Sequence, residues 1–142
     1  MSMKPEEKKL REELIGAEDT ATFQQNYLVE AGAGAGKTYT MVRRIANHLV
    51  SGACEPENLV AITFTKKATE EMRGRLDSRL AELLDYAKNG ERDESGTKLS
   101  VDEKDRRVRR LTHLVRNAGR MQISTIHSFC QTMLSIMPFA SP

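Results

Sequence analysis

The sequence predicts an α/β fold in which parallel strands alternate with flanking helices. A short apolar run at 27–29 comes directly before a glycine-rich loop, and a segment with helical periodicity follows that loop. A second apolar run, at 59–64, is too continuous for a strand with one solvent-facing side, so it is expected to be a buried parallel strand. Strand, loop, helix and strand in this order form a βαβ unit. The chain has 142 residues, 39% hydrophobic and 30% charged, which suits about one domain.

The N-terminus, residues 1–13, is charged throughout and lacks the apolar core of a secretion signal. Residues 3–15 are expected to form a short, mostly solvated helix that stops at Gly16, and a polar connection leads from it to a first strand at 26–30. No run of about eighteen apolar residues occurs, so no membrane span is expected. Cys54 and Cys130 lie far apart and form no CxxC pair. These features predict a reduced, cytoplasmic setting without a membrane partner.

The glycine-rich loop carries the clearest chemical signal. Its glycines alternate with alanines, which leaves little side-chain bulk and lets successive backbone N–H groups point at one spot. Together with the positive end of the following helix, this spot suits a phosphate. Lys37 is expected to reach the outer phosphates and the Thr38 hydroxyl to bind Mg²⁺, so the predicted ligand is a magnesium-bound nucleoside triphosphate. The residues expected to bind it are Ala31, Gly32, Ala33, Gly34, Ala35, Gly36, Lys37 and Thr38.

The loop departs from the strict phosphate-binding pattern at one position. Ala31 stands where the first glycine of that pattern is usual, which restricts the backbone but removes no N–H donor. The alternative interpretation is a flexible Gly/Ala linker that contains Gly-Lys-Thr by chance.

Two amphipathic helices are predicted on either side of the second strand. The first begins at Lys37 and ends near Gly52, with Pro56 in the turn that follows. Its apolar side is formed by Met41, Val42, Ile45, Ala46, Leu49 and Val50. The second helix ends near Gly90 and has its apolar side at Ala68, Met72, Leu76, Leu80, Leu83 and Ala87. Both patterns repeat at the spacing of helical turns.

A third helix follows the surface loop 90–98, which contains no apolar residue. Ser100 and Glu103 have the spacing of a capping box, so the helix is expected to begin after Ser100 and to end at Gly119. Its predicted apolar face is Val108, Leu111, Val115 and Ala118. The opposite face carries Arg106, Arg109, Arg110, His113 and Arg120. This basic excess is compatible with a polyanion partner, and equally with an ordinary solvated face.

A third short strand is predicted at 121–124, followed by a last helix that Pro138 closes. The apolar residues of that helix are Ile126, Phe129, Cys130, Met133 and Met137. The chain is therefore divided into a helix and connection at 1–25, a βαβ part at 26–89, a charged loop and basic helix at 90–120, and a strand and helix at 121–142.

Three segments together resemble one family. The loop AGAGAGKT, the segment AITFTKKATEEMRGRL at 61–76 and the segment STIHSF at 124–129 stand in the order of the first motifs of superfamily 1 DNA helicases of the UvrD/Rep type, including the AddA and RecB branch. The resemblance implies a partial RecA-like P-loop NTPase domain, with 90–120 as the start of an inserted helical subdomain. It also implies ATP and Mg²⁺ as cofactors, and single-stranded DNA or a duplex junction as the partner.

The resemblance assigns the second and third segments to DNA binding. The residues concerned are Thr63, Phe64, Thr65, Lys66, Thr125, His127 and Ser128. A ring at Phe64 offers a base a stacking surface, and threonine hydroxyls and a helix N-terminus can donate to a backbone phosphate. The structural alternatives remain open: Phe64 as a core residue, Thr65 as a helix N-cap, and His127 as a packed histidine without a ligand.

The sequence lacks several parts that ATP hydrolysis requires. The carboxylate pair that holds magnesium usually follows an apolar strand as Asp-Glu, and the near match at 99–103 is better explained as a helix cap. A glutamine that reads adenine is expected well upstream of the loop, whereas Gln24 and Gln25 lie only a few residues before it. No sign of a second RecA-like domain is found. We therefore expect a fragment that binds ATP without hydrolysing it, needs the remainder of the helicase chain, and self-associates through its uncovered apolar faces.

The function predicted from these features is that of the ATP-binding N-terminal segment of a UvrD-like helicase, whose full chain couples ATP hydrolysis to movement along single-stranded DNA. Two alternatives remain. One is a noncatalytic nucleic-acid-binding module with a relic loop, and the other is an unrelated P-loop ATPase or kinase.

Overall fold

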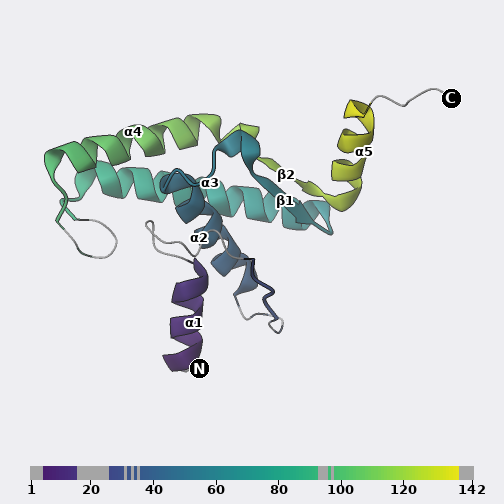
Figure 1. Ribbon diagram of the computed structural model, residues 1–142, viewed down its shortest axis with the longest axis horizontal. Coiled ribbons are helices and arrows are strands. Elements are labelled where there is room, and N and C mark those ends of the chain that lie inside the picture. The colour runs from purple at the N-terminus through teal and green to yellow at the C-terminus, as the bar shows by residue number, and fades with distance from the viewer. Residues whose placement is uncertain are drawn as a thin grey trace.

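The computed structural model describes residues 5–15, 26–30, 32, 34, 36–92, 96 and 98–137. Its helices are α1 (Pro5–Ile15), α2 (Lys37–Val50), α3 (Lys66–Asn89), α4 (Val101–Asn117) and α5 (Ile126–Ile136). The strands are β1 (Val60–Thr63) and β2 (Gln122–Thr125), and two short 3-10 turns cover Pro56–Asn58 and Ala118–Arg120. Figure 1 shows α3 and α4 as two long helices side by side, α2 crossing beside them, and α5 at the far end of the strands.

The strands β1 and β2 form a two-stranded parallel sheet. Parallel neighbours need a long crossover, and α3 and α4 supply it. Ala61 pairs with Ile123 in the register, and both side chains are buried. Val60 and Ile62, which alternate with Ala61 along β1, are about half exposed. Within the described residues, the helices therefore cover one face of this sheet and leave the other face open.

The core lies between α2, α3, α4 and the covered sheet face. Its fully buried leucines are Leu49, Leu76, Leu80, Leu83, Leu111 and Leu114. In α3 the buried positions recur every third or fourth residue, as the apolar pattern predicted. Because α4 shares this core with α2 and α3, it packs directly on the βαβ part, and a domain boundary between the two parts remains a prediction.

Side-chain caps begin three of the helices. Thr65 accepts a hydrogen bond from the Ala68 amide at the start of α3, and Thr125 accepts one from the Ser128 amide at the start of α5. Ser100 and Glu103 form a complete capping box at the start of α4, which confirms the predicted beginning of this helix and excludes the 99–103 segment as a magnesium-binding strand end. Each of these three helices thus begins where its sequence supplies an oxygen for the open amides.

The strand predicted at 26–30 is wrong. These residues have no regular secondary structure, and the described sheet contains only β1 and β2. A strand requires a hydrogen-bonded neighbour, and this short run has none in that sheet. Its side chains are exposed, Leu28 to 90%, while the Tyr27 ring instead receives the Arg44 guanidinium at 4.7 Å from its centroid.

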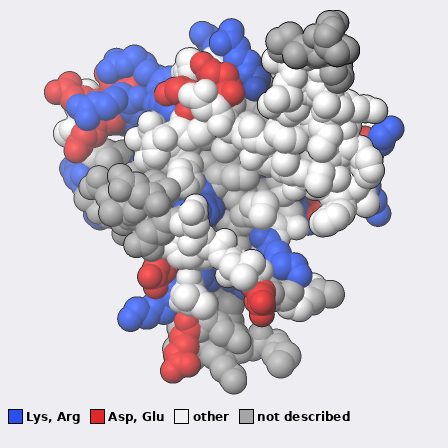
Figure 2. All heavy atoms as spheres, turned by 45° about the vertical axis from the view of Figure 1, so that its right-hand side comes forward, with Lys and Arg blue, Asp and Glu red and all other residues white. Residues whose placement is uncertain are grey.

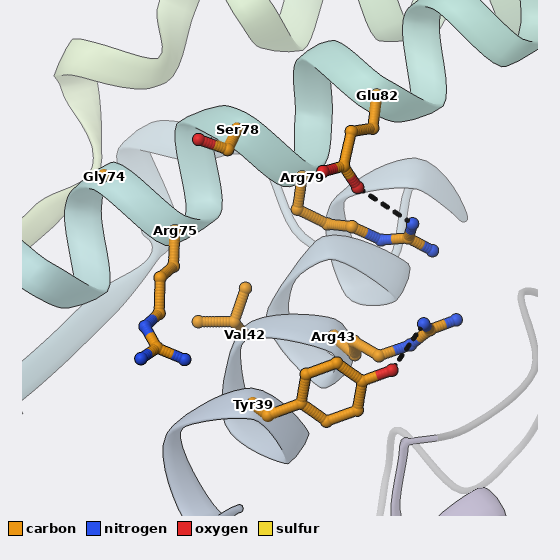
Figure 3. A pocket seen from close by; sticks show the side chains of 8 residues that line it. All are labelled: Tyr39, Val42, Arg43, Gly74, Arg75, Ser78, Arg79 and Glu82. Carbon is orange, nitrogen blue, oxygen red and sulfur yellow. Dashed lines mark hydrogen bonds and ion pairs between the residues drawn. The ribbon is translucent and has the colours of Figure 1, made fainter.

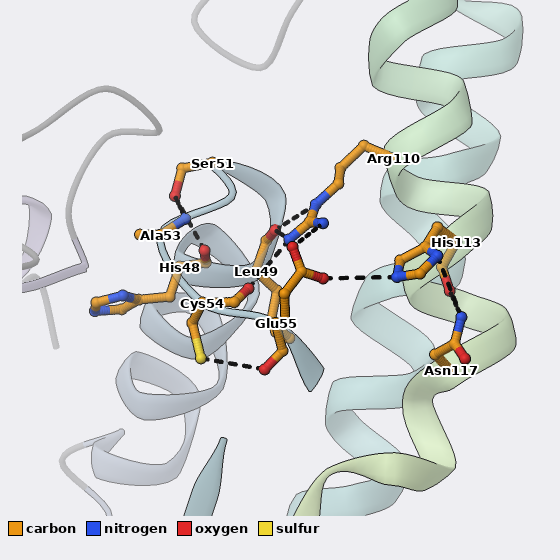
Figure 4. Close-up of polar contacts among 9 residues, drawn as sticks. All are labelled: His48, Leu49, Ser51, Ala53, Cys54, Glu55, Arg110, His113 and Asn117. Carbon is orange, nitrogen blue, oxygen red and sulfur yellow. Dashed lines mark hydrogen bonds and ion pairs between the residues drawn. The ribbon is translucent and has the colours of Figure 1, made fainter. Parts of the chain in front are cut away.

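The predicted faces of α4 need two corrections. Leu114, which the predicted apolar face omits, is fully buried, whereas Val115 is 39% exposed. Arg110, predicted on the exposed basic face, points into the structure, where it binds α2 and the following turn (Figure 4). Sequence spacing locates the stripe of a helix only to within a neighbouring position, and the packing partner decides which residues go inside.

The helix α5 is apolar but has no buried residue. Its Leu134 and Ile136, and Met137 at its C-cap, are each more than half exposed. In the part of the chain that the structure describes, no helix has both the length and the apolar character needed to cross a membrane.

Candidate nucleotide loop and strand-end surface

The glycine-rich loop leads directly into α2. Gly34 has a φ of 77° and Gly36 a φ of 79°, both in the left-handed region that favours glycine. Gly36 is also the N-cap of α2, and its carbonyl accepts the first helical bond from Thr40 at 2.9 Å. The predicted loop residues Ala31, Ala33 and Ala35 lie outside the described residues. At Gly34 and Gly36, therefore, the backbone has a conformation that glycine adopts more readily than other residues do.

The start of α2 differs from the other described helix starts. Its N-cap is a glycine without a side-chain oxygen, whereas Thr65, Ser100 and Thr125 cap the helices that follow them. First-turn amides without such an acceptor, together with the positive end of the helix dipole, form a site that suits an anion. This arrangement is what a phosphate requires.

The two chemically active side chains of the loop stand at this helix start. Lys37 is exposed, and its Nζ donates to the Gly32 carbonyl at 3.4 Å, so the ammonium reaches back over the loop. Thr38 is half-buried in the first turn. The lysine thus lies on the same side as the loop backbone, where an anion bound by the amides would meet it.

A second positive charge comes from α1. The Arg11 guanidinium lies beside Gly36, since a Cβ built on this glycine would be 3.3 Å from Arg11 Nη1. Arg44 of α2 holds α1 in this place by donating to the Leu14 carbonyl at 2.6 Å. Sequence reasoning missed Arg11, because nothing local in a charged helix indicates that one arginine reaches a loop about twenty-five residues away.

The second and third motif segments meet at the end of the sheet. Thr63 pairs with Thr125 in the parallel register, so both strands end at the same edge. The turn after β1 presents Phe64, which is 91% exposed, and this excludes the alternative that Phe64 belongs to the core. Lys66 and His127, each in the first turn of the following helix, are exposed as well. Residues separated by about sixty positions in the chain are thereby collected on one surface, hereafter the strand-end surface.

The hydroxyl groups of the strand-end surface are held by local hydrogen bonds. Thr63 Oγ1 lies 2.6 Å from Thr69 Oγ1 and donates to the Thr65 carbonyl at 3.1 Å. Thr125 Oγ1 donates to Ser128 Oγ at 3.0 Å and accepts from the Ser128 amide. The N-cap role of Thr65 is therefore confirmed, and Thr125 has the same role. These bonds fix the two turns in place while Phe64 points into solvent.

Arg73 connects the two elements that carry the strand-end surface, α3 and β2. Its Nη2 donates to the Ile123 carbonyl at 3.1 Å and so ties α3 to β2. Sequence reasoning placed Arg73 within the second motif but gave it no role. A bond from a side chain to a backbone carbonyl fifty residues away leaves no periodic signal in the sequence.

Charge is distributed unevenly over the molecule. Figure 2 shows a broad uncharged area on the side that carries α5, while lysine and arginine gather elsewhere, interspersed with acidic groups. The described residues contain no group of three or more histidine, cysteine, aspartate or glutamate side chains that could hold a metal ion.

Similar sequences occur among known proteins. The sequence matches the UvrD/REP helicase N-terminal domain over residues 16–139. It is 33% identical over 130 residues to RecBCD enzyme subunit RecB of Escherichia coli (strain K12), which covers 84% of this chain and 11% of the relative. It is also 39% identical over 113 residues to a subunit of the ATP-dependent helicase/nuclease of Ligilactobacillus salivarius (strain UCC118), covering 80% of this chain and 8% of the relative. The first of the matched relatives, RecB of Chlamydia trachomatis, is 30% identical over 131 residues, and the chain spans only 13% of its length.

Proposed function

The chain belongs to the UvrD/REP helicase family through the N-terminal domain of that family, and we propose that it forms the nucleotide-binding and strand-holding part of an ATP-dependent DNA helicase. The single observation that carries this proposal is the pairing of Thr63 with Thr125, which joins two distant motif segments into one surface. The glycine loop at the start of α2 supplies the second half of the proposal.

The loop is proposed to bind ATP with Mg²⁺. Support comes from the left-handed glycines, the uncapped helix start and Lys37 above the loop. Lys37 would neutralise the outer phosphates and Thr38 would contribute one magnesium ligand. Some relatives are named as subunits of an ATP-dependent helicase/nuclease, which is consistent with this ligand.

The strand-end surface is proposed to bind single-stranded DNA, or the single strand at a duplex junction. The exposed Phe64 ring offers a base a stacking platform, and Lys66 lies at the start of α3 beside it. The N-terminus of α5 follows the neighbouring strand β2 directly and contributes His127 to this surface. Because none of these groups reads base edges in a fixed pattern, we expect binding with little sequence preference.

The activity of the whole protein is a further part of the proposal. Hydrolysis would require carboxylates that hold the metal and position the attacking water. Translocation along single-stranded DNA and unwinding of a duplex would need the remainder of the helicase chain. In that chain, ATP binding at the loop would be coupled to movement of the DNA strand held at the strand-end surface. The segment 90–120 would begin an inserted helical subdomain.

Nucleotide titration tests the loop. We expect Lys37→Ala to weaken binding of Mg²⁺-ATP about ten- to hundredfold, because it removes a charge-assisted hydrogen bond of roughly 1.5–3 kcal/mol. Isothermal titration calorimetry on the purified chain measures this. Lys88→Ala removes an exposed lysine from the last turn of α3. It is the matched control and should bind Mg²⁺-ATP as the parent chain does. Equal affinities in all three proteins would refute the nucleotide site.

A further inference from the structure

The outward face of α4 and the turn after it present a row of exposed basic side chains, hereafter the basic row. Its members are Arg109, His113, Arg116 and Arg120. The first three follow one another at the spacing of helical turns, and the fourth stands in the 3-10 turn that continues the helix. The buried Leu111 and Leu114 occupy the opposite side of α4 and face the core. The basic row therefore points away from the rest of the fold, and neither the loop nor the strand-end surface includes it.

Positive and negative charges are separated along α4. From Arg106 to Arg120 the sequence contains six arginines and no aspartate or glutamate. The acidic residues of the helix all precede this stretch and are Asp102, Glu103 and Asp105. The Glu103 carboxylate is held by Ser100 in the capping box. The charge of the basic row is thus not interspersed with carboxylates of its own helix.

Two further acidic residues come from the turn that packs against the end of α4. Glu55 lies 2.6 Å from Arg110, an arginine outside the basic row, and its other oxygen is 3.6 Å from His113 Nε2 (Figure 4). Arg110 therefore offsets the Glu55 charge. Glu57 is exposed in the 3-10 turn Pro56–Asn58, and the described residues contain no ion pair between it and the basic row.

The arginines of the basic row differ from those that line the hollow between α2 and α3 (Figure 3). In that hollow each guanidinium already has a partner: Arg43 the Tyr39 hydroxyl at 2.8 Å, Arg75 the Glu71 carboxylate at 2.7 Å, and Arg79 the Glu82 carboxylate at 3.5 Å. Within the described residues, by contrast, Arg109, Arg116 and Arg120 take part in no hydrogen bond or ion pair. Their guanidinium groups can therefore bind an anion from outside the chain without giving up an internal contact.

We propose that the basic row binds the backbone of the duplex part of a DNA junction whose single strand lies on the strand-end surface. Guanidinium groups form two-pronged hydrogen bonds with phosphate oxygens. Surfaces for single strands combine cations with aromatic rings on which unpaired bases stack, and α4 contains no phenylalanine, tyrosine or tryptophan. Cations alone suit a duplex, whose bases are stacked inside and whose backbone carries one charge per about 1.7 Å of axis. The inference rests on the proposed DNA-binding function and adds a second contact surface to it.

The position of the basic row fits such a junction. From Arg109 to Arg120 the row spans about 16 Å at roughly 1.5 Å per residue, the length of about five base pairs. Arg120 stands just before β2, and Thr125 at the other end of this four-residue strand belongs to the strand-end surface. Figure 1 shows α4 extending away from the strands. The single strand would therefore lie at one end of β2, and the duplex would lie along α4 from the other end.

The test compares a tailed duplex with its single strand alone. Fluorescence anisotropy is recorded for a labelled oligothymidylate of about 16 nucleotides, and for the same strand joined to a duplex of about 12 base pairs in either polarity. The row variant Arg109→Gln/Arg116→Gln removes two exposed charges from α4. The control variant Lys9→Gln/Lys88→Gln removes two exposed charges from α1 and α3. Far-UV circular dichroism verifies that both variants are folded.

We expect the row variant to bind the tailed duplex about tenfold more weakly than the parent chain does. The slope of log affinity against log salt concentration should become shallower by about 0.9 for each duplex phosphate contact that is lost. The affinity of the row variant for the oligothymidylate should stay within about twofold, because this strand reaches only the strand-end surface. The control variant has the same net charge as the row variant, yet both of its affinities should stay within about twofold, since salt screens charges distant from the DNA.

Three results would overturn the inference without affecting the proposed function. The first is a row variant that binds the tailed duplex as the control variant does, while Phe64→Ala still weakens DNA binding. The second is an equal loss of affinity for the oligothymidylate and the tailed duplex, which would assign the basic row to the single strand. The third is a parent chain that binds the tailed duplex no more tightly than the oligothymidylate. If the parent chain binds neither DNA, the proposed DNA-binding function fails and the inference fails with it.

Discussion

The guanidinium of Arg110 binds the end of α2, the following turn and a carboxylate at the same time. Its Nε and Nη2 donate to the Leu49 carbonyl at 2.9 and 2.7 Å, and Nη2 also donates to the Cys54 carbonyl at 3.1 Å. Its Nη1 lies 2.6 Å from Glu55 Oε1, and His113 approaches the other oxygen of that carboxylate at 3.6 Å. Burial, with the neighbouring Glu55 charge, raises the pKa of the Cys54 thiol. Figure 4 shows how these groups join α4 to α2.

Replacing Arg110 should therefore destabilise the fold. We expect Arg110→Met to lower the free energy of unfolding by about 2 kcal/mol, because it leaves carbonyl groups at the end of a helix and a partly buried carboxylate without their donor. Arg109→Met is the matched control, since its exposed neighbouring side chain should change stability by less than about 0.5 kcal/mol. Urea unfolding followed by circular dichroism measures both. Equal losses in the two variants would contradict the role given to Arg110.

Phe64 should act on DNA binding and leave stability unchanged. The ring is 91% exposed, so Phe64→Ala removes almost no packing. If a base stacks on it, the substitution should weaken binding of single-stranded DNA by about 1–3 kcal/mol, with the same salt dependence. Phe64→Leu keeps an apolar side chain without a π-face and should recover little of the loss. Anisotropy and thermal unfolding distinguish this from a structural role, for which the unfolding temperature would fall as well.

Local signals made some residues predictable from the sequence, and long-range contacts made others unpredictable. Ser100 and Glu103 lie three positions apart, so their spacing alone predicts the capping box that the structure contains. Arg110 and Glu55 lie 55 positions apart, so only the fold reveals their contact. Arg73 and Arg11 escaped prediction for the same reason. The positions of Lys37 and Phe64 followed from their motifs, but their roles in binding remain predictions.

At the scale of elements, helices were easier to predict than strands. Periodicity and caps located α2, α3 and α4 because a helix satisfies its backbone within its own segment. The strand predicted at 59–64 is shorter in the structure, where it covers 60–63, and the strand predicted at 121–124 lies one residue later, at 122–125. The partner strand determines where pairing stops, and this is not visible in the local sequence. The segment 26–30 has a strand-like composition but no partner in the described sheet. The α/β class was thus predictable, whereas the extent of the sheet was not.

The capping box of α4 should make this helix sensitive to acid. The Ser100 hydroxyl and then the Ser100 amide, both bonded to Glu103, lower the pKa of the Glu103 carboxyl. A carboxyl whose pKa is lower in the folded state stabilises the fold above its unfolded pKa of about 4.3, and this contribution is lost as the pH falls through the folded value. The stability that the Glu103 carboxylate gives to α4 should therefore persist near neutral pH and decrease only in acid, as the carboxylate becomes protonated.

Glu103→Gln isolates this effect. The amide keeps an acceptor for Ser100 but cannot titrate, so the variant should be less stable than the parent chain near pH 7, with the difference shrinking toward about pH 3. Thermal unfolding by circular dichroism across this range measures the difference. Asp102→Asn, which removes a carboxylate charge from the same helical turn but leaves the capping box intact, is the matched control. A difference that stays constant from neutral to acid pH would contradict the assignment.

At the scale of the whole molecule, the arrangement leaves apolar surface uncovered. The open face of the sheet presents Val60 and Ile62, each about half exposed, and α5 extends from the same end without a buried residue. Figure 2 shows this side as a broad area without charge. Contiguous apolar surface of this kind is uncommon on isolated soluble domains and marks places where other protein surfaces pack.

The isolated chain should therefore associate with itself as its concentration rises. Static light scattering is expected to give an apparent mass above the 16.0 kDa of one chain, increasing with concentration. Val60→Thr/Ile62→Thr should reduce this association, because threonine preserves the β-branched shape that suits a strand while removing apolar surface. Met41→Gln, which alters a similarly exposed apolar side chain on α2, is the control and should associate as the parent chain does. A constant monomer mass in the parent chain, or equal association in both variants, would show that the open sheet face does not drive it.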